Sequence, residues 1–254
     1  MRFTVLGSGT SSGVPTIGCK CRTCLSADSR DKRLRSSLLV QSNSTTALID
    51  TSPDFRQQML SNRVDKLDGI IFTHHHFDHI GGFDDIRAYN FILGRPMPIH
   101  LNNSTLKALK RVFSYAFGDV EQLGGGVPLI DLNIIDGEAF SVGDIKFEPV
   151  KLMHGKLEVL GFRIENFAYL TDVNYIPPES FEKLRGLDAL IIDCLRPQPH
   201  STHFNLSQAL EAIDIIKPKR AYFTHIAHQI KHEEFESKLP QGVQLAYDGM
   251  IIDV

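Results

Sequence analysis

The sequence predicts an α/β fold of four layers, with two β-sheets packed face to face and helices covering both outer faces. Three observations support this. Apolar, β-branched runs of strand length dominate the chain, helical segments fall in groups between them, and further strands close the sequence. Such alternation of strands and helices is typical of α/β folds. Because no linker, repeat or low-complexity tract interrupts the chain, we expect residues 1–254 to form a single domain.

The predicted elements are segments bounded by turn-forming residues. The strand segments are residues 3–6, 37–41, 46–50, 69–72, 98–101, 129–135, 145–152, 161–165, 167–171, 189–193, 220–224, 243–247 and 250–253. The helix segments are residues 54–61, 79–92, 104–117, 178–184, 207–216 and 232–238. Pro218 ends the helix at 207–216, in which apolar residues recur at helical spacing. Glu165-Asn166 and Asp248-Gly249 are predicted to be tight hairpin turns.

Composition and charge exclude several classes of protein. The formal net charge of -3 argues against a protein built to wrap nucleic acid, although it leaves room for a small anionic substrate. No run approaches the roughly 20 apolar residues that a membrane span needs. The apolar start of the chain is too short for a secretory signal, so we expect a cytoplasmic protein.

The basic cluster Arg30, Lys32, Arg33 and Arg35 is predicted to be a solvated loop rather than a substrate site.

Three of the four cysteines lie within six positions, at Cys19, Cys21 and Cys24. Cysteines this close do not pair easily with one another, and in a reducing compartment such a cluster indicates a metal site. A closed tetrahedral zinc site needs a fourth ligand, for which His228 is the candidate. The alternative is three reactive or incidental cysteines beside a surface histidine. The fourth cysteine, Cys194, follows an apolar run and is expected to be a small buried core residue.

A second metal motif is the run Thr-His-His-His-Phe-Asp-His at residues 73–79. It follows an apolar strand segment, so these residues would lie on a loop. His74 and His76, at alternate positions, would point to one metal ion, and the adjacent pair Asp78 and His79 would point to a second. Imidazole and carboxylate ligands together suit zinc, manganese or iron. The zinc-protease pattern of two histidines four apart on a helix is absent. His75 is expected to point away from its neighbours and to bind no metal.

These residues resemble the HxHxDH signature of the metallo-β-lactamase superfamily, and the resemblance extends over essentially the whole chain. It implies an αββα sandwich with further ligands at the ends of later strands. His154, Asp172 and His225 each follow an apolar run in the expected order. Asp50 also ends a strand segment, and by similarity it orients a ligand rather than binding metal.

The resemblance further implies how two divalent cations, zinc or manganese, are shared among these residues. His74, His76 and His154 would bind the first; Asp78, His79 and His225 would bind the second; Asp172 would bridge both. Two cations roughly 3.5–4 Å apart lower the pKa of a shared water and clamp the attacking and leaving oxygens. The resulting hydroxide would attack phosphorus in line, or a carbonyl carbon in an ester, which makes the protein a metal-dependent hydrolase.

The glycine-rich stretch at residues 6–15, the cysteine cluster and the segment Thr-His-Ile-Ala-His-Gln at 224–229 together resemble the PhnP family. Its phosphodiesterases open a phosphoribosyl 1,2-cyclic phosphate and carry a structural zinc beside the dinuclear site. The resemblance implies a small phosphodiester as substrate and a structural zinc on Cys19, Cys21, Cys24 and His228, while the lack of a long apolar run predicts no membrane partner. Because relatives are often dimers, it also allows a homodimer.

Relatives use one more histidine, placed before a helix, near the leaving group. His203 fits this place better than His200. It would protonate a leaving alkoxide, and it is predicted to be catalytic together with Asp78 and Asp172.

Three other functions compete with a phosphodiesterase. They are a ribonuclease Z-like RNA-processing nuclease, a lactonase or thioester hydrolase on the same fold, and a binding module with degenerate metals. The net negative charge and the lack of a long basic insertion weigh against the nuclease, and the filled ligand positions weigh against the binding module.

Overall fold

The computed structural model describes residues 1–117 and 126–254, and within them the strands form two sheets of seven. In spatial order, the first sheet contains β14 (Ile251–Asp253), β1 (Arg2–Gly7), β2 (Ser37–Gln41), β3 (Thr46–Ile49), β4 (Gly69–Ile71), β5 (Met97–Leu101) and β6 (Ile130–Ile134). The second contains β13 (Val243–Leu245), β12 (Arg220–Thr224), β11 (Ala189–Asp193), β10 (Phe167–Leu170), β9 (Leu157–Ile164), β8 (Ile145–His154) and β7 (Phe140–Val142). The short strand β7 was not predicted.

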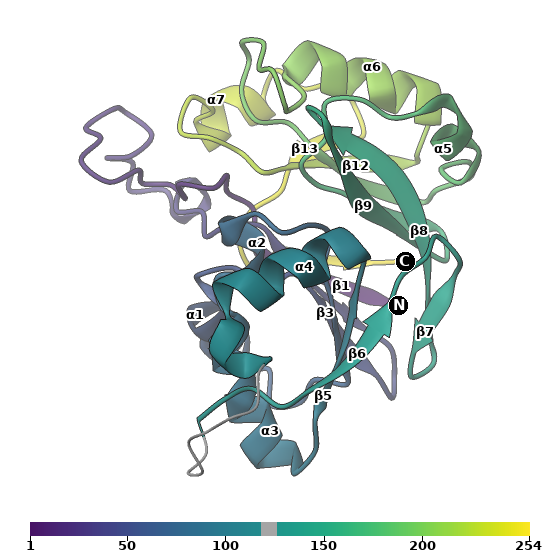
Figure 1. Ribbon diagram of the computed structural model, residues 1–254. Coiled ribbons are helices and arrows are strands. Elements are labelled where there is room, and N and C mark those ends of the chain that lie inside the picture. The colour runs from purple at the N-terminus through teal and green to yellow at the C-terminus, as the bar shows by residue number, and fades with distance from the viewer. Residues whose placement is uncertain (118–125) are drawn as a thin grey trace.

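Helices cover the outer face of each sheet (Figure 1). Over the first sheet lie α1 (Phe55–Asn62), α2 (Phe77–Ile80), α3 (Arg87–Leu93) and α4 (Asn103–Val112). Over the second lie α5 (Pro178–Glu182), α6 (Leu206–Ile216) and α7 (His232–Glu236). Short 3-10 turns are formed at Ser29–Asp31, Phe83–Ile86 and Ser114–Ala116. Among the residues described, no helix combines the length and apolar character required to cross a bilayer.

The four layers follow from alternation along the strands. In β2, Leu38 packs into the core between the sheets, whereas Leu39 packs into the core under the first sheet's helices. In β11, Ile191 faces the core between the sheets and Leu190 faces the helices of the second sheet. Strand side chains alternate between faces, so apolar residues at successive positions require cover on both sides. The predicted four-layer α/β fold is confirmed.

The predicted helix over residues 79–92 is wrong as a single element. The chain instead forms α2, a 3-10 turn at Phe83–Ile86 and α3. The break falls at Gly81 and Gly82, where a Cβ on Gly82 would lie 2.3 Å from the Ser52 carbonyl oxygen. The segment after β3, which contains Ser52, therefore packs directly against the backbone of Gly82 and leaves no room for a side chain there. Glycine is also a weak helix former, which helps to end α2 at this point.

Of the two predicted hairpin turns, one is confirmed and the other is wrong. Glu165 and Asn166 join the antiparallel strands β9 and β10. Asp248 and Gly249 instead carry the chain from β13 in the second sheet to β14 in the first. The Asp248 carboxylate accepts hydrogen bonds from Ser8 N at 2.8 Å and Leu34 N at 2.7 Å. These long-range bonds fix the crossover, and local turn chemistry could not reveal them.

The predicted solvated loop of basic residues is wrong for Arg33, which is 1% exposed. Its guanidinium donates to Asp31 Oδ1 at 3.0 Å and to the Ile230 carbonyl oxygen at 3.0 Å. Arg35 also has a partner, because it donates to Asp54 Oδ1 at 2.9 Å. Arg33 therefore ties the chain before β2 to the segment before α7. A guanidinium with this many donors can be buried when its carboxylate and carbonyl partners are fixed.

Candidate metal centre

The predicted ligands of the dinuclear site come together at one edge of the two sheets. β3 and β4 run parallel in the first sheet, and β10, β11 and β12 run parallel in the second, so their carboxyl ends meet at a common edge. Four overlapping groups of potential ligand atoms lie there, each with its atoms within 4.8 Å of one another, and two of them contain all seven predicted ligands. The first ligand group is His74, His76 and His154, and the second ligand group is Asp78, His79, Asp172 and His225.

The loop after β4 owes its shape to Asp50, which follows β3. One Asp50 carboxylate oxygen accepts from Thr73 N at 2.8 Å, and the other accepts from Thr73 Oγ1 at 2.8 Å and contacts His79 Nδ1 at 2.7 Å. This pairing leaves His79 Nε2 directed to the centre. The structure thus gives Asp50 the orienting contact expected from the sequence, because a histidine whose other nitrogen is hydrogen-bonded keeps a fixed ring orientation.

Asp172 lies between the two ligand groups. Its Oδ1 atom is 3.1 Å from His79 Nε2, and its Oδ2 atom is 3.3 Å from His225 Nε2 and 4.0 Å from His74 Nε2. Thr171 Oγ1 donates a hydrogen bond to Oδ1 at 2.7 Å. One carboxylate therefore reaches imidazoles of both groups, which is the arrangement that a bridging ligand requires.

Three residues of this edge have left-handed backbone conformations that non-glycine residues seldom adopt. They are Asp50, Asp172 and His225, with φ of 65°, 54° and 58°, and each lies just after a strand of the sheet core. Such conformations cost of order 1–3 kcal/mol each and persist where the surroundings determine them. Here the left-handed conformation directs the side chain of each residue away from the line of its strand and toward the centre.

The imidazoles of the centre fit metal ligands. The Nε2 atoms of His74, His79 and His225 are buried, and although each lies 3.1–4.0 Å from an Asp172 oxygen, none makes a hydrogen bond of good geometry within residues 1–117 and 126–254. Buried polar atoms without partners are rare, so their convergence indicates a bound group. Burial lowers the pKa of His74, His76 and His154, which keeps these rings neutral and their lone pairs available.

The carboxylates of the centre also fit cations. Burial opposes their ionisation, but the neighbouring imidazoles hold the pKa of Asp78 and Asp172 below the ordinary range. Burial likewise opposes protonation of His79, yet the surrounding carboxylates, above all Asp172 and Asp78, raise its pKa well above the usual value. Buried carboxylates need compensating positive charge, which protonated His79 supplies here and which a divalent first-row cation would supply on displacing that proton.

His203 lies at the same edge, 8% exposed and three residues before the start of α6 at Leu206. Its Nδ1 atom is 2.7 Å from Asp193 Oδ2, and its ring stacks on His225 with centroids 4.6 Å apart. Burial opposes protonation, but Asp193 outweighs it and raises the pKa of His203 to about 9. His200 has no such carboxylate contact within residues 1–117 and 126–254, and burial followed by the charge of His203 lowers its pKa.

Asp193 is a site residue that the sequence analysis missed. It ends β11, is fully buried, and accepts from Val173 N at 2.9 Å as well as contacting His203. The available signal was an aspartate ending an apolar strand, the pattern that drew attention to Asp172. His75 belongs to neither ligand group, as expected, and its ring centroid lies 5.6 Å from that of His76.

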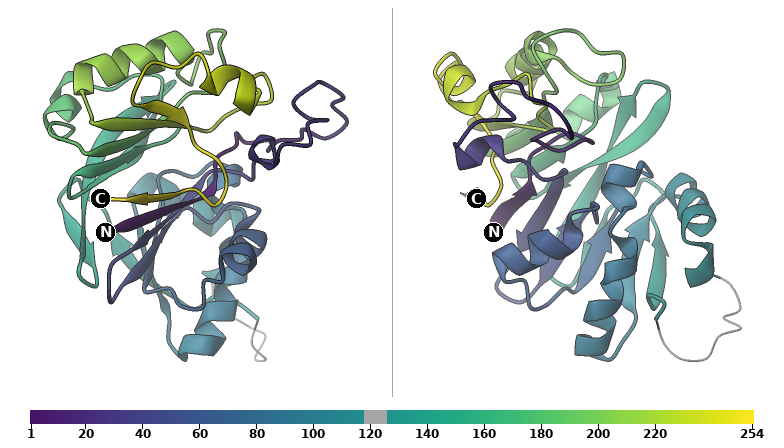
Figure 2. Two further views of the ribbon diagram at one scale, coloured as in Figure 1. Left: turned by 180° about the vertical axis from the view of Figure 1, so that it is seen from behind. Right: turned by 90° about the vertical axis from the view of Figure 1, so that its left-hand side faces the viewer.

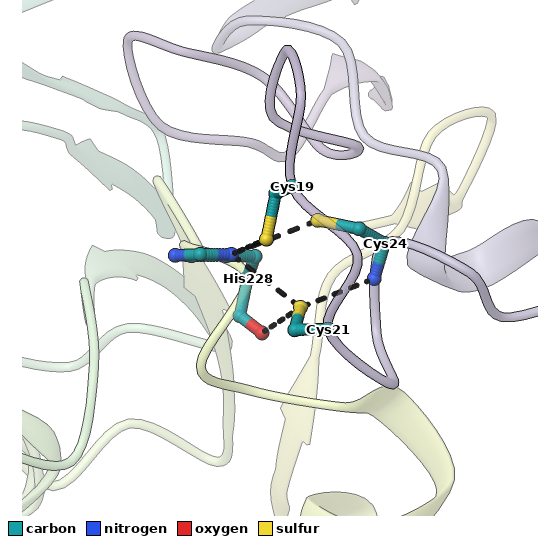
Figure 3. A group of neighbouring side chains, drawn as sticks. All are labelled: Cys19, Cys21, Cys24 and His228. Carbon is teal, nitrogen blue, oxygen red and sulfur yellow. Dashed lines mark hydrogen bonds between the residues drawn. The ribbon is translucent and has the colours of Figure 1, made fainter.

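The four residues predicted to form a second metal site also lie together. The chain between β1 and β2 leaves the sheets as an extended arm (Figure 2), and it brings three cysteines to His228 (Figure 3). His228 Nδ1 is 3.2 Å from Cys19 Sγ, 3.5 Å from Cys21 Sγ and 3.6 Å from Cys24 Sγ. A hydrogen bond from Cys24 N is the main reason that the pKa of Cys21 falls to about 6, while burial raises the pKa of Cys24 to about 11. Cys194 is fully buried in the second sheet's core, as predicted.

Comparisons with known proteins agree with this geometry. The family model for the Beta-lactamase superfamily domain matches residues 45–226. A solved structure described as a new diphosphatase from the PhnP family is 44% identical, with a TM-score of 0.93 over 100% of this chain and 97% of that chain. Zinc-bound PqqB from Methylobacterium extorquens, at 21% identity and a TM-score of 0.80 over 100% of both chains, shares the fold.

A curated relative in sequence is the octanoyltransferase of Porphyromonas gingivalis strain W83, which is 39% identical over 259 residues. The match covers 100% of this chain but 52% of the relative, so this chain spans about half that protein's length. The superfamily model, the full-length likeness to a PhnP-family structure and the convergent His/Asp groups agree. The chain therefore belongs to the metallo-β-lactamase superfamily and to its PhnP family, and it is a metal-dependent hydrolase.

Proposed function

We propose that this protein is a phosphodiesterase that hydrolyses small phosphodiesters, including a cyclic ribose phosphate, at a dinuclear metal centre. The observation that carries the proposal is the pair of ligand groups joined through Asp172. Two adjacent cations suit an in-line displacement at phosphorus, where both the attacking and the leaving oxygen need stabilisation. The diphosphatase description of the PhnP-family relative supports chemistry at phosphorus.

In this proposal the first ligand group would hold one cation, Asp78, His79 and His225 would hold the other, and Asp172 would be shared by both. Bound zinc or manganese would polarise the phosphoryl oxygens and lower the pKa of a water molecule. The protein's own contribution is orientation. Asp50 fixes the His79 ring, and the Thr202 carbonyl oxygen, 2.6 Å from His154 Nδ1, fixes the His154 ring.

His203 is the proposed general acid for the leaving oxygen. A ring nitrogen of His203 lies within 4.8 Å of ligand atoms of His154 and Asp172, so its proton is available at the reacting centre. The Asp193 carboxylate holds the other side of the ring and favours the protonated form. This contact supports His203 over His200 for the role.

The competing functions differ either in the size of the substrate or in the bond that is broken. A ribonuclease Z-like nuclease would need affinity for a polyanion, for which a net charge of -3 offers little attraction. A lactonase or thioester hydrolase would use the same metal centre on a carbonyl carbon. The octanoyltransferase name belongs to a relative of about twice the length, and the convergent His/Asp groups favour hydrolysis for this chain.

A substrate panel tests the proposal. Protein stripped with a chelator and reloaded with manganese or zinc should hydrolyse bis(p-nitrophenyl) phosphate and a five-membered cyclic ribose phosphate, and the stripped protein should not. The panel also contains a diphosphate diester, a lactone, a thioester and a precursor tRNA. Faster turnover of the lactone, the thioester or the RNA than of every small phosphodiester would refute the proposal.

The cysteine cluster is proposed to hold a structural zinc on Cys19, Cys21, Cys24 and His228. Three thiolates and one imidazole complete a tetrahedral site. Gly9 pairs with Ile226 between the arm and the segment carrying His225 and His228, so this zinc would brace the wall of the centre. Free thiolates require a reducing compartment, which supports a cytoplasmic location.

Removing one thiolate should release this zinc. We expect Cys21→Ser to contain one zinc fewer per chain than the wild type by elemental analysis, with a lower melting temperature, because metal binding to a closed site contributes to folding. Cys194→Ser is the matched control and should keep the full zinc content. An unchanged zinc content in Cys21→Ser would contradict the structural site.

A further inference from the structure

Three loops of the second sheet meet beside the metal centre, and each carries one residue of the site. The turn after β8 begins directly after His154, the last residue of that strand. The loop after β10 contains Asp172, and the loop before α6 contains His203. Their relative positions decide whether these three side chains converge. Asn174 lies in the middle loop and is half-buried.

The side chain of Asn174 bonds to both neighbouring loops. Its Oδ1 atom accepts a hydrogen bond from Gly155 N at 2.7 Å, and its Nδ2 atom donates to the Ser201 carbonyl oxygen at 3.2 Å. Its backbone N–H donates to the Met153 carbonyl oxygen at 2.9 Å. One amide group therefore joins the residue after His154 to the residue before Thr202.

The two loops joined by Asn174 also touch each other where His154 is oriented. The Thr202 carbonyl oxygen is 2.6 Å from His154 Nδ1. Gly155 has φ of +63°, and a Cβ at this position would lie 2.9 Å from Thr202 Cγ2. A side chain at residue 155 would therefore strain the backbone and force either the turn or Thr202 to move, beside the contact that sets the His154 ring.

The loop that carries His203 has separate support. Phe204 N donates to the Val173 carbonyl oxygen at 2.7 Å, and Val173 N donates to Asp193 Oδ2 at 2.9 Å. These are backbone donors, so a change of the Asn174 side chain leaves them in place. Loss of the amide should therefore affect His154 more than His203.

We propose that Asn174 is a positioning residue that sets the affinity of the first ligand group for its cation by holding Thr202 against His154. The inference rests on the proposed function, in which His154 binds a metal. Groups that orient a metal-binding histidine typically change metal affinity or activity about 10–100-fold when they are removed. The geometry assigns this role to an amide that touches no potential metal ligand directly.

Direct manganese binding by the full chain tests the role of Asn174. The wild type should bind two manganese ions per chain, and in Asn174→Ala one of them should bind about tenfold or more weakly while the other keeps its affinity. Activity on bis(p-nitrophenyl) phosphate should return at saturating manganese, with KM for the diester little changed. Asn62→Ala is the matched control, because it removes a side-chain hydrogen bond from Asn62 to the Gln58 carbonyl oxygen in α1.

A second pair of variants tests the same contact without changing Asn174. Gly155→Ala should weaken one manganese site, and adding Thr202→Ser, which removes the Cγ2 atom, should restore part of the affinity. Wild-type affinity at both sites of folded Asn174→Ala would overturn the proposal. If Asn174→Ala does not fold, Asn174→Ser, whose side chain is too short to join Gly155 N to the Ser201 carbonyl oxygen, is measured in its place, and wild-type affinity at both of its sites would overturn the proposal. A wild type that binds manganese without cleaving diesters would refute the proposed function alone.

Discussion

The Asp172→Ala variant is expected to lose at least about 10³-fold in kcat/KM on bis(p-nitrophenyl) phosphate. Asp172 is the residue through which the two ligand groups meet, with contacts of 3.1 Å to His79 Nε2 and 3.3 Å to His225 Nε2. Its removal would separate the two cations and leave buried imidazoles facing one another. A metal centre stabilises transition-state charge by several kcal/mol, and each 1.36 kcal/mol corresponds to a factor of ten in rate.

The measurement pairs steady-state kinetics with circular dichroism and metal analysis. Asp188→Ala is the matched control, because it removes a carboxylate from a surface pair with Lys219 and should leave the rate unchanged. Asp172→Asn keeps the side-chain volume and provides a second variant if the alanine form does not fold. Near wild-type activity in either folded Asp172 variant would show that the two-metal mechanism is wrong.

His203→Ala should slow hydrolysis according to the basicity of the leaving group. General acids typically contribute 10²–10⁴-fold, so we expect about a 10²-fold or greater loss of kcat for diesters that release an alkoxide. The p-nitrophenolate ion leaves without protonation, so bis(p-nitrophenyl) phosphate should be affected much less. Comparison of the two substrates separates proton donation from metal loss, which would slow both equally.

His200→Ala is the control for this experiment. His200 accepts from Thr202 N at 3.3 Å, and its ring centroid is 5.2 Å from that of His203, but no carboxylate in the described part of the chain orients it. We expect its rate to stay within a few-fold of the wild type on both substrates. A leaving-group effect in His200→Ala that is absent in His203→Ala would reverse the assignment.

Local patterns determined the strands and the candidate ligands of this protein. β2, β11 and β12 begin and end where apolar runs predicted, because a strand buried on both faces needs an unbroken apolar sequence. The cluster from His74 to His79 and the cysteines from Cys19 to Cys24 are also local, since short spacing alone brings their side chains near one another. The distant ligands His154, Asp172 and His225 were predicted through family resemblance, which supplied the pairing of strand ends that spacing does not encode.

Only the tertiary structure decided which polar groups orient those ligands. Asp193 gained its role because β11 lies between β10 and β12, which brings its carboxylate to His203. Asn174 gained its role because three loops far apart in sequence meet beside the centre. The break at Gly82 and the crossover at Asp248 likewise depend on contacts with distant segments. Hydropathy and spacing predict the structure of a single segment. The contacts named here form between distant segments, and only after both sheets have packed and fixed the directions of their strand ends.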